Sequence, residues 1–584
     1  MCSLRTKFFL LSVLLISDLA AEQLAYTLSV DETTFQYVKV NITVKQTNHR
    51  RLRFSMPSWI PGAYEWRSFG DQVIRFSAVD SSGSSVRWEK LSRSDWEVQP
   101  TSSQVQVDYL LKPAGRFWWG TSLDSTGALL EGASTWMVIH NLERVPISIR
   151  LQTPASWTVS TALPMVGQND YQASGYDELA DCPILLGRLS DTTFTVSGAE
   201  HAVYFFGQTD FDRKAFIAMV HRIVAEQARL MQGLPYSRYT FQYILSADER
   251  GSSGLEHATS TTIRLSALEV MKEVHRAAGI TSHEFFHLWN VKRLTSAALQ
   301  PLNYHQEART ESLWWFEGVT SYYADLTLLR CGIWSMDEFL KSLALEIEQL
   351  QGNPDRLKTT VAQASWRVWQ NGLANPGISY YNKGYLVGLL LDLVIRKVTD
   401  NKKSLDHVMR YLYHNYGVSR RGIRDDEWPF LLLQATGKDF MPFFDRYIYG
   451  LVELPYEDIL AIAGLQATLA TKSVPTIGRI RILGPRNRVY SLDETSAAGR
   501  AGLRRNDLIL SVDGQTVSDE TSLEQRVAMM TIGQTALLRI SRDGREMVLP
   551  VTVEGLEKTT CSLSPLAHPS EQALRIRTSW TTGK

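Results

Sequence analysis

The sequence predicts a multidomain α+β protein with an antiparallel β domain first, a mainly helical domain next, and a small β module near the end. Three observations support this prediction. At 584 residues the chain is too long for a single hydrophobic core. Apolar side chains alternate as in strands up to about position 200, and then repeat with helical spacing until about position 466. The strand pattern returns at residues 473–555.

Charge and hydropathy exclude two broad classes of function. The 61 Lys and Arg residues balance the 61 Asp and Glu residues, and no basic stripe is present, so nucleic-acid binding is not expected. After the N-terminus, no stretch approaches the roughly 18 uninterrupted apolar residues of a membrane span. Stable membrane insertion of the mature chain is therefore not expected.

Residues 1–21 have the pattern of a secretory signal peptide. Arg5 and Lys7 give a positive start, Phe8 to Ile16 form a short apolar run, and Ala20-Ala21 offers a cleavage site. Cleavage would yield a secreted or periplasmic protein. The alternative is an N-terminal membrane anchor, although the apolar run is short for a bilayer.

Residues 22–200 are predicted to form the N-terminal β domain. The segments 26–30, 37–44 and 105–111 alternate apolar and polar residues and are rich in β-branched and aromatic side chains. Residues 56–64 form an unusual aromatic loop with two prolines, which either packs as ordinary turns or contacts the next domain.

The middle domain, residues 201–466, contains the most informative motif. His283-Glu284-Phe285-Phe286-His287 places two histidines four residues apart, on one face of a helix predicted for residues 269–293. Two imidazoles at this spacing suit two corners of a tetrahedral zinc site. Glu284 lies beside them, where a carboxylate can take a proton from a metal-activated water.

A catalytic zinc needs a third protein ligand, and the candidates are acidic. We prefer Glu317, because it lies in an apolar stretch of a helix predicted for residues 310–329, and a buried carboxylate is costly unless it is paired or bound to metal. Glu307 is the main rival and Glu311 a further candidate; Glu307 could instead orient a ligand histidine.

Two further residues are candidates for contact with substrate. Tyr381 begins the helix predicted around residue 384, where a phenol held near a metal could donate to a developing oxyanion. Glu256 ends a Gly- and Ser-rich loop after a predicted strand at 239–245, whose edge could line a substrate cleft. From spacing alone, aromatic packing is the favoured explanation for Tyr381, and a solvated loop is the favoured explanation for Glu256.

The C-terminal segment is predicted to hold an independent module and a tail. Residues 473–555 show five strands, one helix and a hairpin turn at Arg542-Asp543-Gly544. Residues 557–584 are polar and aperiodic, and are expected to be disordered. Cys182, Cys331 and Cys561 are too scattered for a disulfide framework; one bridge is possible but cannot be assigned.

Five motifs resemble those of the M61 metallopeptidases, the glycyl aminopeptidase family. The two strongest are HEFFHLWNVKR at residues 283–293 and LWWFEGVTSYY at residues 313–323. Residues 56–64 are similar to the family's Trp-x-Pro-Gly-x-Tyr segment, residues 254–257 to its Gly-Gly-Leu-Glu-His loop, and residues 381–384 to its Tyr-x-Lys-Gly motif. These matches occur in order between about residues 25 and 465.

The resemblance implies a thermolysin-like (gluzincin) catalytic domain behind a β domain. It implies one Zn²⁺ per chain on His283, His287 and Glu317, with Glu284 as general base and acid. By analogy with the related M1 aminopeptidases, Glu256 would hold the α-ammonium of a peptide with a free N-terminus, and Tyr381 would stabilise the tetrahedral intermediate. The sequence departs from the family at Ser253, where the loop usually has a glycine.

Residues 473–555 resemble a PDZ domain of the type found in bacterial proteases. The segments that carry this resemblance are Ala497 to Leu503 and Asn506 to Gly514. The expected carboxylate-binding loop is poorly matched by Thr476-Ile477-Gly478-Arg479. Capture of a peptide C-terminus and a tethering role therefore both remain open.

We predict a secreted or periplasmic zinc aminopeptidase that removes small first residues, Gly or Ala, from peptides. The first alternative is a zinc endopeptidase whose PDZ module presents polypeptide ends. The second alternative is a non-enzymatic peptide-binding protein, which the intact ligand set disfavours. No Gly-x-Ser-x-Gly motif supports a serine hydrolase.

Overall fold

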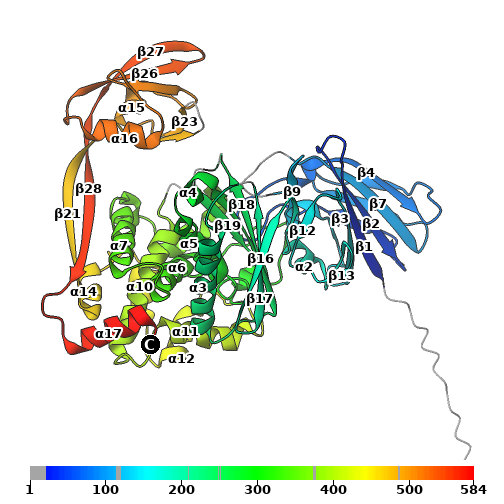
Figure 1. Ribbon diagram of the computed structural model, residues 1–584, viewed down its shortest axis with the longest axis horizontal. Coiled ribbons are helices and arrows are strands. Elements are labelled where there is room, and N and C mark those ends of the chain that lie inside the picture. The colour runs from blue at the N-terminus through cyan, green and yellow to red at the C-terminus, as the bar shows by residue number, and fades with distance from the viewer. Residues whose placement is uncertain are drawn as a thin grey trace, which may run out of the picture. The chain divides into compact units, whose positions relative to one another are not determined.

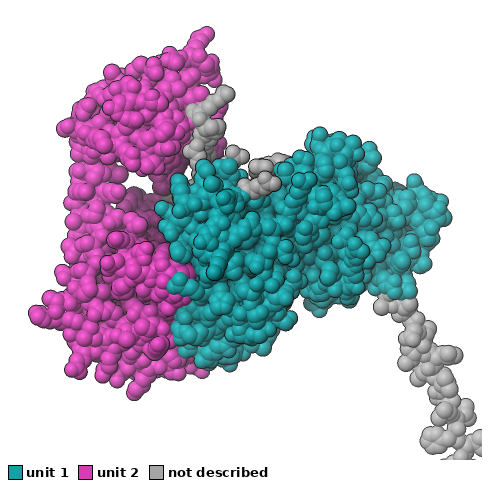
Figure 2. Space-filling model, in the orientation of Figure 1, with its two compact units in different colours: residues 1–310, 366–374, 410–427 teal, residues 311–365, 375–409, 428–584 magenta. Residues whose placement is uncertain are grey.

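The computed structural model describes residues 22–113, 120–207, 209–247, 249, 251–371, 377–483 and 487–584. The expected signal peptide therefore lies outside the described residues. The chain divides into two compact units, which are coloured separately in Figure 2. Unit 1 comprises residues 1–310, 366–374 and 410–427, and unit 2 comprises residues 311–365, 375–409 and 428–584. Within the described ranges, no helix has the length and apolar character needed to cross a membrane.

Unit 1 begins with the predicted β domain, which has a seven-stranded sheet of order β13-β14-β11-β1-β2-β7-β4. Strand β1 illustrates why these segments form a sheet. Its alternate residues are buried, so one face of the strand packs on the hydrophobic core. The sheet is antiparallel except where β1 pairs in parallel with β11. Its strands are β1 (Gln23–Val30), β2 (Val38–Lys45), β4 (Val73–Asp80), β7 (Gln104–Leu111), β11 (Ile147–Gln152), β13 (Met165–Gly167) and β14 (Asp170–Ala173).

Two four-stranded sheets complete this domain. The first has the order β10-β3-β6-β5 and the second the order β12-β15-β9-β8. Their strands are β3 (Leu52–Ser55), β5 (Trp88–Lys90), β6 (Asp95–Val98), β8 (Ser122–Asp124), β9 (Gly127–Leu130), β10 (Val138–Ile139), β12 (Thr158–Ser160) and β15 (Ile184–Gly187). Short helix α2 (Tyr176–Ala180) precedes β15.

A five-stranded sheet of order β16-β17-β18-β20-β19 opens the middle region. Its strands are β16 (Ser190–Val196), β17 (Ala199–Phe206), β18 (Arg238–Ser246), β19 (Ser252–Glu256) and β20 (Ser260–Ser266), with helix α3 (Arg213–Met231) between β17 and β18. The expected edge strand, β18, is internal, as its nearly continuous burial requires. The edge is β19, which was expected to be a flexible loop.

The helix that carries the two histidines is shorter than predicted. Instead of one helix over residues 269–293, the chain forms α4 (Ala267–Lys272), a 3₁₀ turn at Val274–Ala277 and α5 (Ala278–Phe286). The break falls at Glu273, whose extended backbone (φ −157°, ψ 116°) ends α4.

Unit 2 is largely helical, and its second predicted helix starts late. Thr310 does not cap it; a π-helical segment, η4 (Trp314–Val319), runs directly into α6 (Thr320–Arg330). Helices α7 (Met336–Gln351) and α10 (Tyr380–Val398) pack beside them. The other helices in this stretch of the chain are α8 (Val361–Trp366), α11 (Leu405–Leu412), α12 (Trp428–Thr436), α13 (Met441–Tyr447) and α14 (Tyr456–Leu460).

The expectation of a disordered tail at residues 557–584 is wrong. Strand β28 (Glu554–Pro565) pairs with β21 (Leu465–Thr476), and helix α17 (Glu571–Thr582) follows, drawn in red in Figure 1. Ala573, Ile576 and Trp580 are buried at helical spacing, a short apolar stripe hidden among polar residues.

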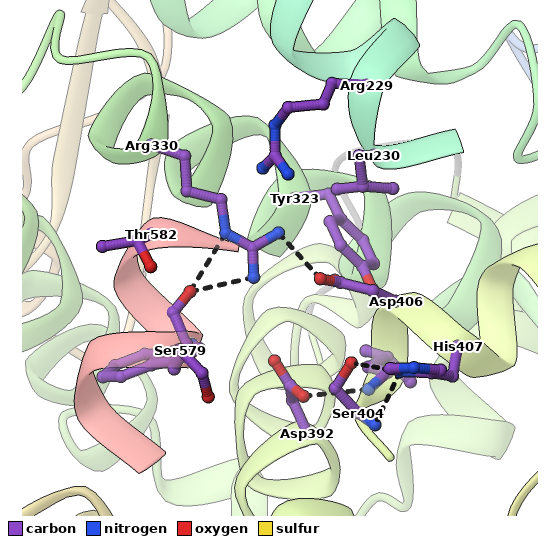
Figure 3. Close-up of polar contacts among 12 residues, drawn as sticks. Arg229, Leu230, Tyr323, Arg330, Asp392, Ser404, Asp406, His407, Ser579 and Thr582 are labelled. Atoms are coloured by element: carbon purple, nitrogen blue, oxygen red, sulfur yellow. Dashed lines mark hydrogen bonds and ion pairs between the residues drawn. The ribbon is translucent and has the colours of Figure 1, made fainter. Parts of the chain in front are cut away.

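Polar contacts hold the last turn of α17 against unit 2. The guanidinium of Arg330 donates to the carbonyl of Trp580 and pairs with Asp406 at 3.0 Å (Figure 3). The indole Nε1 of Trp580 donates to the hydroxyl of Tyr322 at 2.7 Å. Because Trp580 is fully buried, this helix is part of the unit's core.

The PDZ-like module lies between β21 and β28 in the chain and has a hydrophobic core of its own. Its strands are β22 (Ile480–Leu483), β23 (Arg488–Leu492), β24 (Leu508–Val512), β25 (Gln515–Thr516), β26 (Thr535–Arg542) and β27 (Arg545–Thr552), with helices α15 (Ala497–Arg500) and α16 (Glu520–Ala528). The predicted hairpin turn is present: Asp543 and Gly544 both have positive φ between paired Arg542 and Arg545.

Candidate active site

The two motif histidines converge at the end of α5 in unit 1. Their Nε2 atoms lie 2.9 Å apart. The Nδ1 atom of His287 is 2.8 Å from the carbonyl oxygen of Asn290, which can only accept, so Nδ1 carries the hydrogen. The Nε2 lone pair of His287 is thereby directed toward His283. This is the tautomer and orientation that a metal-binding histidine needs.

Glu284 lies where it can act on a substrate near the histidines. It is only 5% exposed. One carboxylate oxygen each from Glu256 and Glu284 and one ring nitrogen of His287 lie within 4.8 Å of one another. Three groups that can bind a metal or a proton are therefore gathered at one end of α5.

Edge strand β19 runs directly over Glu284, and Gly254 makes this approach possible. A Cβ atom added at Gly254 would lie 2.2 Å from Cγ and Cδ of Glu284. No side chain fits there, so the glycine of the Gly-Leu-Glu-His loop is required by contact rather than by backbone conformation. Glu256, two residues after Gly254 on the same strand, is also buried.

The aromatic loop at residues 56–64 contacts the middle region, so the second of its two interpretations is correct. The Trp59 ring packs edge-on against Trp369 with centroids 5.1 Å apart, and its Nε1 donates to the carbonyl of Asn303 at 2.9 Å. Gly62 has a φ of 95°, and a Cβ there would lie 2.8 Å from a carboxylate oxygen of Glu256. The β domain thus forms one side of the Glu256 environment.

Asp181, from the β domain, contacts residues of two motifs, His257 of the 254–257 loop and Lys292 of the 283–293 segment. It was not identified as a candidate from the sequence. Its carboxylate accepts from Lys292 Nζ at 2.5 Å and from the backbone N–H of Ala258 at 2.8 Å. His257 Nδ1 lies 3.4 Å away. Burial alone would raise the pKa of Asp181, but the charge of Lys292 and the contact with His257 outweigh it and lower that pKa. No motif surrounds Asp181, so no sequence pattern indicated its role.

In unit 2, Glu317 and Tyr381 lie on two segments that cross at a pair of glycines. A Cβ at Gly318 would be 2.4 Å from the Cα of Gly384, so η4 and α10 touch backbone to backbone. Glu317 is 2% exposed on η4. Single π-helical turns are frequent at functional sites. Gly318 leaves room for the backbone of α10 to approach η4.

Tyr381 is the second residue of α10, next to Tyr380. Ser379 caps this helix, and the two tyrosine rings stack with centroids 4.8 Å apart. Burial, and then the nearby charge of Glu317, raise the pKa of Tyr380 well above its usual value. The rival ligand Glu307, in unit 1, instead accepts a hydrogen bond from Arg309 at 2.7 Å.

Comparison with family models gives three matches. Residues 25–188 match the Peptidase M61 N-terminal domain, residues 276–387 match M61 glycyl aminopeptidase, and residues 464–553 match a PDZ domain. The chain belongs to the M61 family of metallopeptidases. The resemblance seen in the motifs is confirmed, and with it the predicted succession of a β domain, a helical middle region and a PDZ-like module.

Two solved structures are similar to this M61 chain. It superposes on an aminopeptidase N family protein from Idiomarina loihiensis with a TM-score of 0.83 and 26% identity, covering 96% of this chain and 100% of that one. An M1 zinc metallopeptidase from Deinococcus radiodurans gives a TM-score of 0.49 and 14% identity, covering 74% of this chain and 94% of that one.

One curated protein shares a short segment with this M61 chain. It is a probable periplasmic serine endoprotease, DegP-like, from Chlamydia trachomatis, 36% identical over 58 residues. The shared segment is 10% of this chain and spans only 12% of that protein's length.

Proposed function

We propose that this chain is a zinc-dependent aminopeptidase that removes the first residue, chiefly Gly or Ala, from peptides with a free N-terminus. The observation that carries the proposal is the 2.9 Å approach of the two Nε2 atoms on α5, with the Glu284 carboxylate beside them. Two imidazoles at this spacing can bind a metal ion, and an adjacent glutamate can act as the general base in metal-dependent peptide hydrolysis.

The donor set fits one zinc ion. Two imidazoles and one carboxylate are the protein ligands of many catalytic zinc sites, which keep a fourth position open. His283 and His287 would supply the nitrogens and Glu317 the carboxylate. Its nearly complete burial on η4 supports Glu317, because a carboxylate so enclosed needs a cation or hydrogen-bond donors. The ion would supply Lewis-acid activation of water and of the substrate carbonyl.

The chain's own residues would carry the protons and hold the peptide. Glu284 would take the proton of the attacking water on its carboxylate and pass it to the leaving amine. The hydroxyl of Tyr381 would donate a hydrogen bond to the carbonyl oxygen as negative charge develops there. The Glu256 carboxylate would pair with the α-ammonium of the first residue, which would make cleavage depend on a free N-terminus.

Two measurements test the proposal together. We expect purified protein to contain about one zinc per chain, and chelation to abolish hydrolysis of alanyl and glycyl reporter amides. Glu284→Gln should lower kcat by about 10²–10⁴-fold, the usual contribution of a general base, while zinc remains bound. Retained activity in this variant would remove the assigned role of Glu284, and a metal-free active protein would remove the zinc site.

A zinc endopeptidase is the second candidate, and the PDZ domain favours it. PDZ domains bind extended peptides along a strand edge, so this module could deliver polypeptide substrates. Matched peptides with free and acetylated N-termini separate the two functions. Loss of cleavage on acetylation supports the aminopeptidase, because Glu256 would have no ammonium to bind; equal cleavage supports the endopeptidase.

We further propose that the protein acts outside the cytoplasm. The signal-like pattern of residues 1–21 supports export. The short similarity to a protein described as a periplasmic endoprotease points the same way. Fractionation of cells that produce the full chain, with N-terminal sequencing of the mature protein, tests both export and cleavage.

A further inference from the structure

A small polar cavity lies beside Tyr381 in unit 2, and nothing so far assigns it a role. It has a volume of about 110 Å³. Drug-sized ligand pockets usually exceed about 300 Å³, so this one suits a single side chain rather than a separate ligand. The residues that line it come from α6, α7 and the start of α10: Ser321, Glu346, Gln349, Ser379, Tyr381 and Asn382.

The cavity is joined to the proposed catalytic residues through its own walls. Tyr381 is one wall. Ser321, another wall, lies one helical turn after Glu317, and its hydroxyl donates to the Glu317 carbonyl at 3.0 Å. A group that fills this cavity is therefore next to the residue that would contact the scissile carbonyl.

The lining holds one acidic residue, Glu346, and no basic residue. The Glu346 carboxylate accepts from the side-chain amide of Asn382, and in the described part of the chain no lysine or arginine pairs with it. Asp325 is outside the lining, where its carboxyl group accepts from Ser342 at 2.8 Å and from Tyr385 at 3.2 Å. Glu346 is therefore the group in this cavity that can pair with a cation.

Burial raises the pKa of Glu346, although its hydrogen bond from Asn382 opposes the change. A positive charge paired with Glu346 would lower this pKa and favour the ionised carboxylate. Burial also raises the pKa of Asp325 to about 7, with a smaller contribution from Glu346.

A metal ion is a poor occupant. Among the described residues, the groups of three or more ligands close enough to share an ion do not include Glu346 or Asp325. An ammonium or guanidinium group needs no such cluster, because one carboxylate with hydroxyl and amide oxygens around it satisfies its hydrogens.

We propose that this cavity is a specificity pocket for the basic side chain, Lys or Arg, of the second residue of the peptide, which follows the cleaved bond, with Glu346 as the residue that selects it. The proposal rests on the peptidase function above. Glu346 acts by pairing with the substrate side chain, while Ser321, Asn382 and Gln349 supply neutral oxygens around the charge.

The test compares matched peptides that begin with Ala and carry Lys or norleucine at the second position. Wild-type protein should prefer Lys at this position by about tenfold or more in kcat/KM. Glu346→Gln, which keeps the shape and removes the charge, should bring that ratio close to one while cleavage of the norleucine peptide changes less than about twofold. Glu524→Gln, an exposed residue of α16, is the matched control and should keep the wild-type ratio.

A binding readout separates the pocket from the chemistry. Calorimetric titration of the same peptides into Glu284→Gln protein, with and without Glu346→Gln, should show the same loss of Lys preference. A wild-type enzyme that cleaves norleucine peptides without preferring Lys at the second position overturns the pocket and leaves the aminopeptidase intact. Absence of all cleavage with preserved Lys selectivity in binding overturns the proposed activity and supports the pocket; absence of both overturns both.

Discussion

At Gly254 the main chain of β19 passes so close to the Glu284 side chain that no substituent can be added. The nearest atoms to an ideal Cβ are Cγ, Cδ and Oε1 of Glu284, all at 2.2 Å. Real Cβ atoms do not approach other atoms so closely, so either the strand or the carboxylate would have to move. The position of the proposed general base is therefore set by a glycine 30 residues earlier in the chain.

Gly254→Ala should lower kcat/KM by about 10²-fold, since a displacement of about 1 Å at a catalytic group has effects of this size. The protein should remain folded, with zinc content unchanged. Gly251→Ala is the control: a Cβ there meets nothing within 4 Å, and activity should stay near wild type. Equal activity in the two variants would show that β19 can move away without loss of activity, and that its contact does not position Glu284.

The pair of Asp181 and Lys292 makes a prediction about pH. The pKa of Asp181 is lowered, so its contribution to stability is complete above the unfolded carboxyl pKa of about 4 and is lost as pH falls below it. Burial would lower the pKa of Lys292, but the charge of Asp181 outweighs burial, so this pKa is raised. The contribution of Lys292 to stability is therefore lost as pH rises above about 10.5. The pair therefore stabilises the protein between these limits.

Asp181→Asn should lower the unfolding free energy of unit 1 by about 3–5 kcal/mol near neutral pH, as expected when one partner of a buried pair is removed. The difference from wild type should shrink as pH falls below about 4, because the unfolded chain then binds a proton at Asp181 that the folded protein does not yet bind. Asp170→Asn, at an exposed pair with Arg150, is the control and should change little. Denaturant unfolding across pH measures both; a difference that does not shrink in acid would refute the linkage.

At the scale of elements, the crossing of η4 and α10 decides where Glu317 and Tyr381 lie. A Cβ at Gly384 would be 2.5 Å from the carbonyl oxygen of Trp314, and one at Gly318 would meet Gly384 itself. Two helical segments can approach this closely only when both contact residues lack side chains. Gly318 of the motif at residues 313–323 and Gly384 of the motif at residues 381–384 thus contact each other.

Gly384→Ala should destabilise unit 2 by about 1–3 kcal/mol and reduce activity, because overpacking forces α10 away from η4. Gly388→Ala, one turn later, is the control. Its Cβ would lie 3.2 Å from a Val319 methyl group, which can yield, and alanine is the better helix former. Thermal unfolding and kcat should both separate the two variants. If Gly384→Ala behaves like Gly388→Ala, the crossing tolerates a side chain and does not fix the geometry.

Element types followed well from periodicity, but element boundaries did not. The period of the apolar residues indicated helices around His283, Glu317 and Tyr381, and all three lie in or at the end of helical segments. The break at Glu273 and the π-helical turn at residues 314–319 carry no sequence signal, because they depend on what the backbone packs against. The strand β19 was missed because Gly254 and its serines have low strand propensity, and pairing with β20 overrides that.

At the scale of the whole molecule, the PDZ-like module is an insertion rather than a terminal addition. Strands β21 and β28 pair along their full length, from Leu465 opposite Pro565 to Thr476 opposite Glu554. The chain then returns to α17, whose Trp580 is buried against Tyr322 and Phe339. Both ends of the insertion are therefore anchored in unit 2 (Figure 1).

Joining Thr476 to Glu554 through an Asn-Gly turn, which removes residues 477–553, should leave the rest folded. These two residues already pair, so a two-residue hairpin turn can close the ladder. Zinc content and hydrolysis of short amides should stay within about twofold of wild type. Loss of activity on polypeptides alone would favour the endopeptidase; loss of zinc or solubility would contradict the independence of the module.

The sequence by itself determined the succession of domains, the family and the identity of the chemical groups proposed to act. These depend on composition, period and short motifs, which are local properties of the chain. The tertiary structure decided that residues 557–584 are ordered, that β19 is the edge strand, and that Asp181, Gly62 and Gly254 belong around the active-site groups. The physical reason is that these features are contacts between residues far apart in sequence: a Trp580 in a polar tail or a glycine beside a carboxylate acquires its role only from the atoms that folding brings against it.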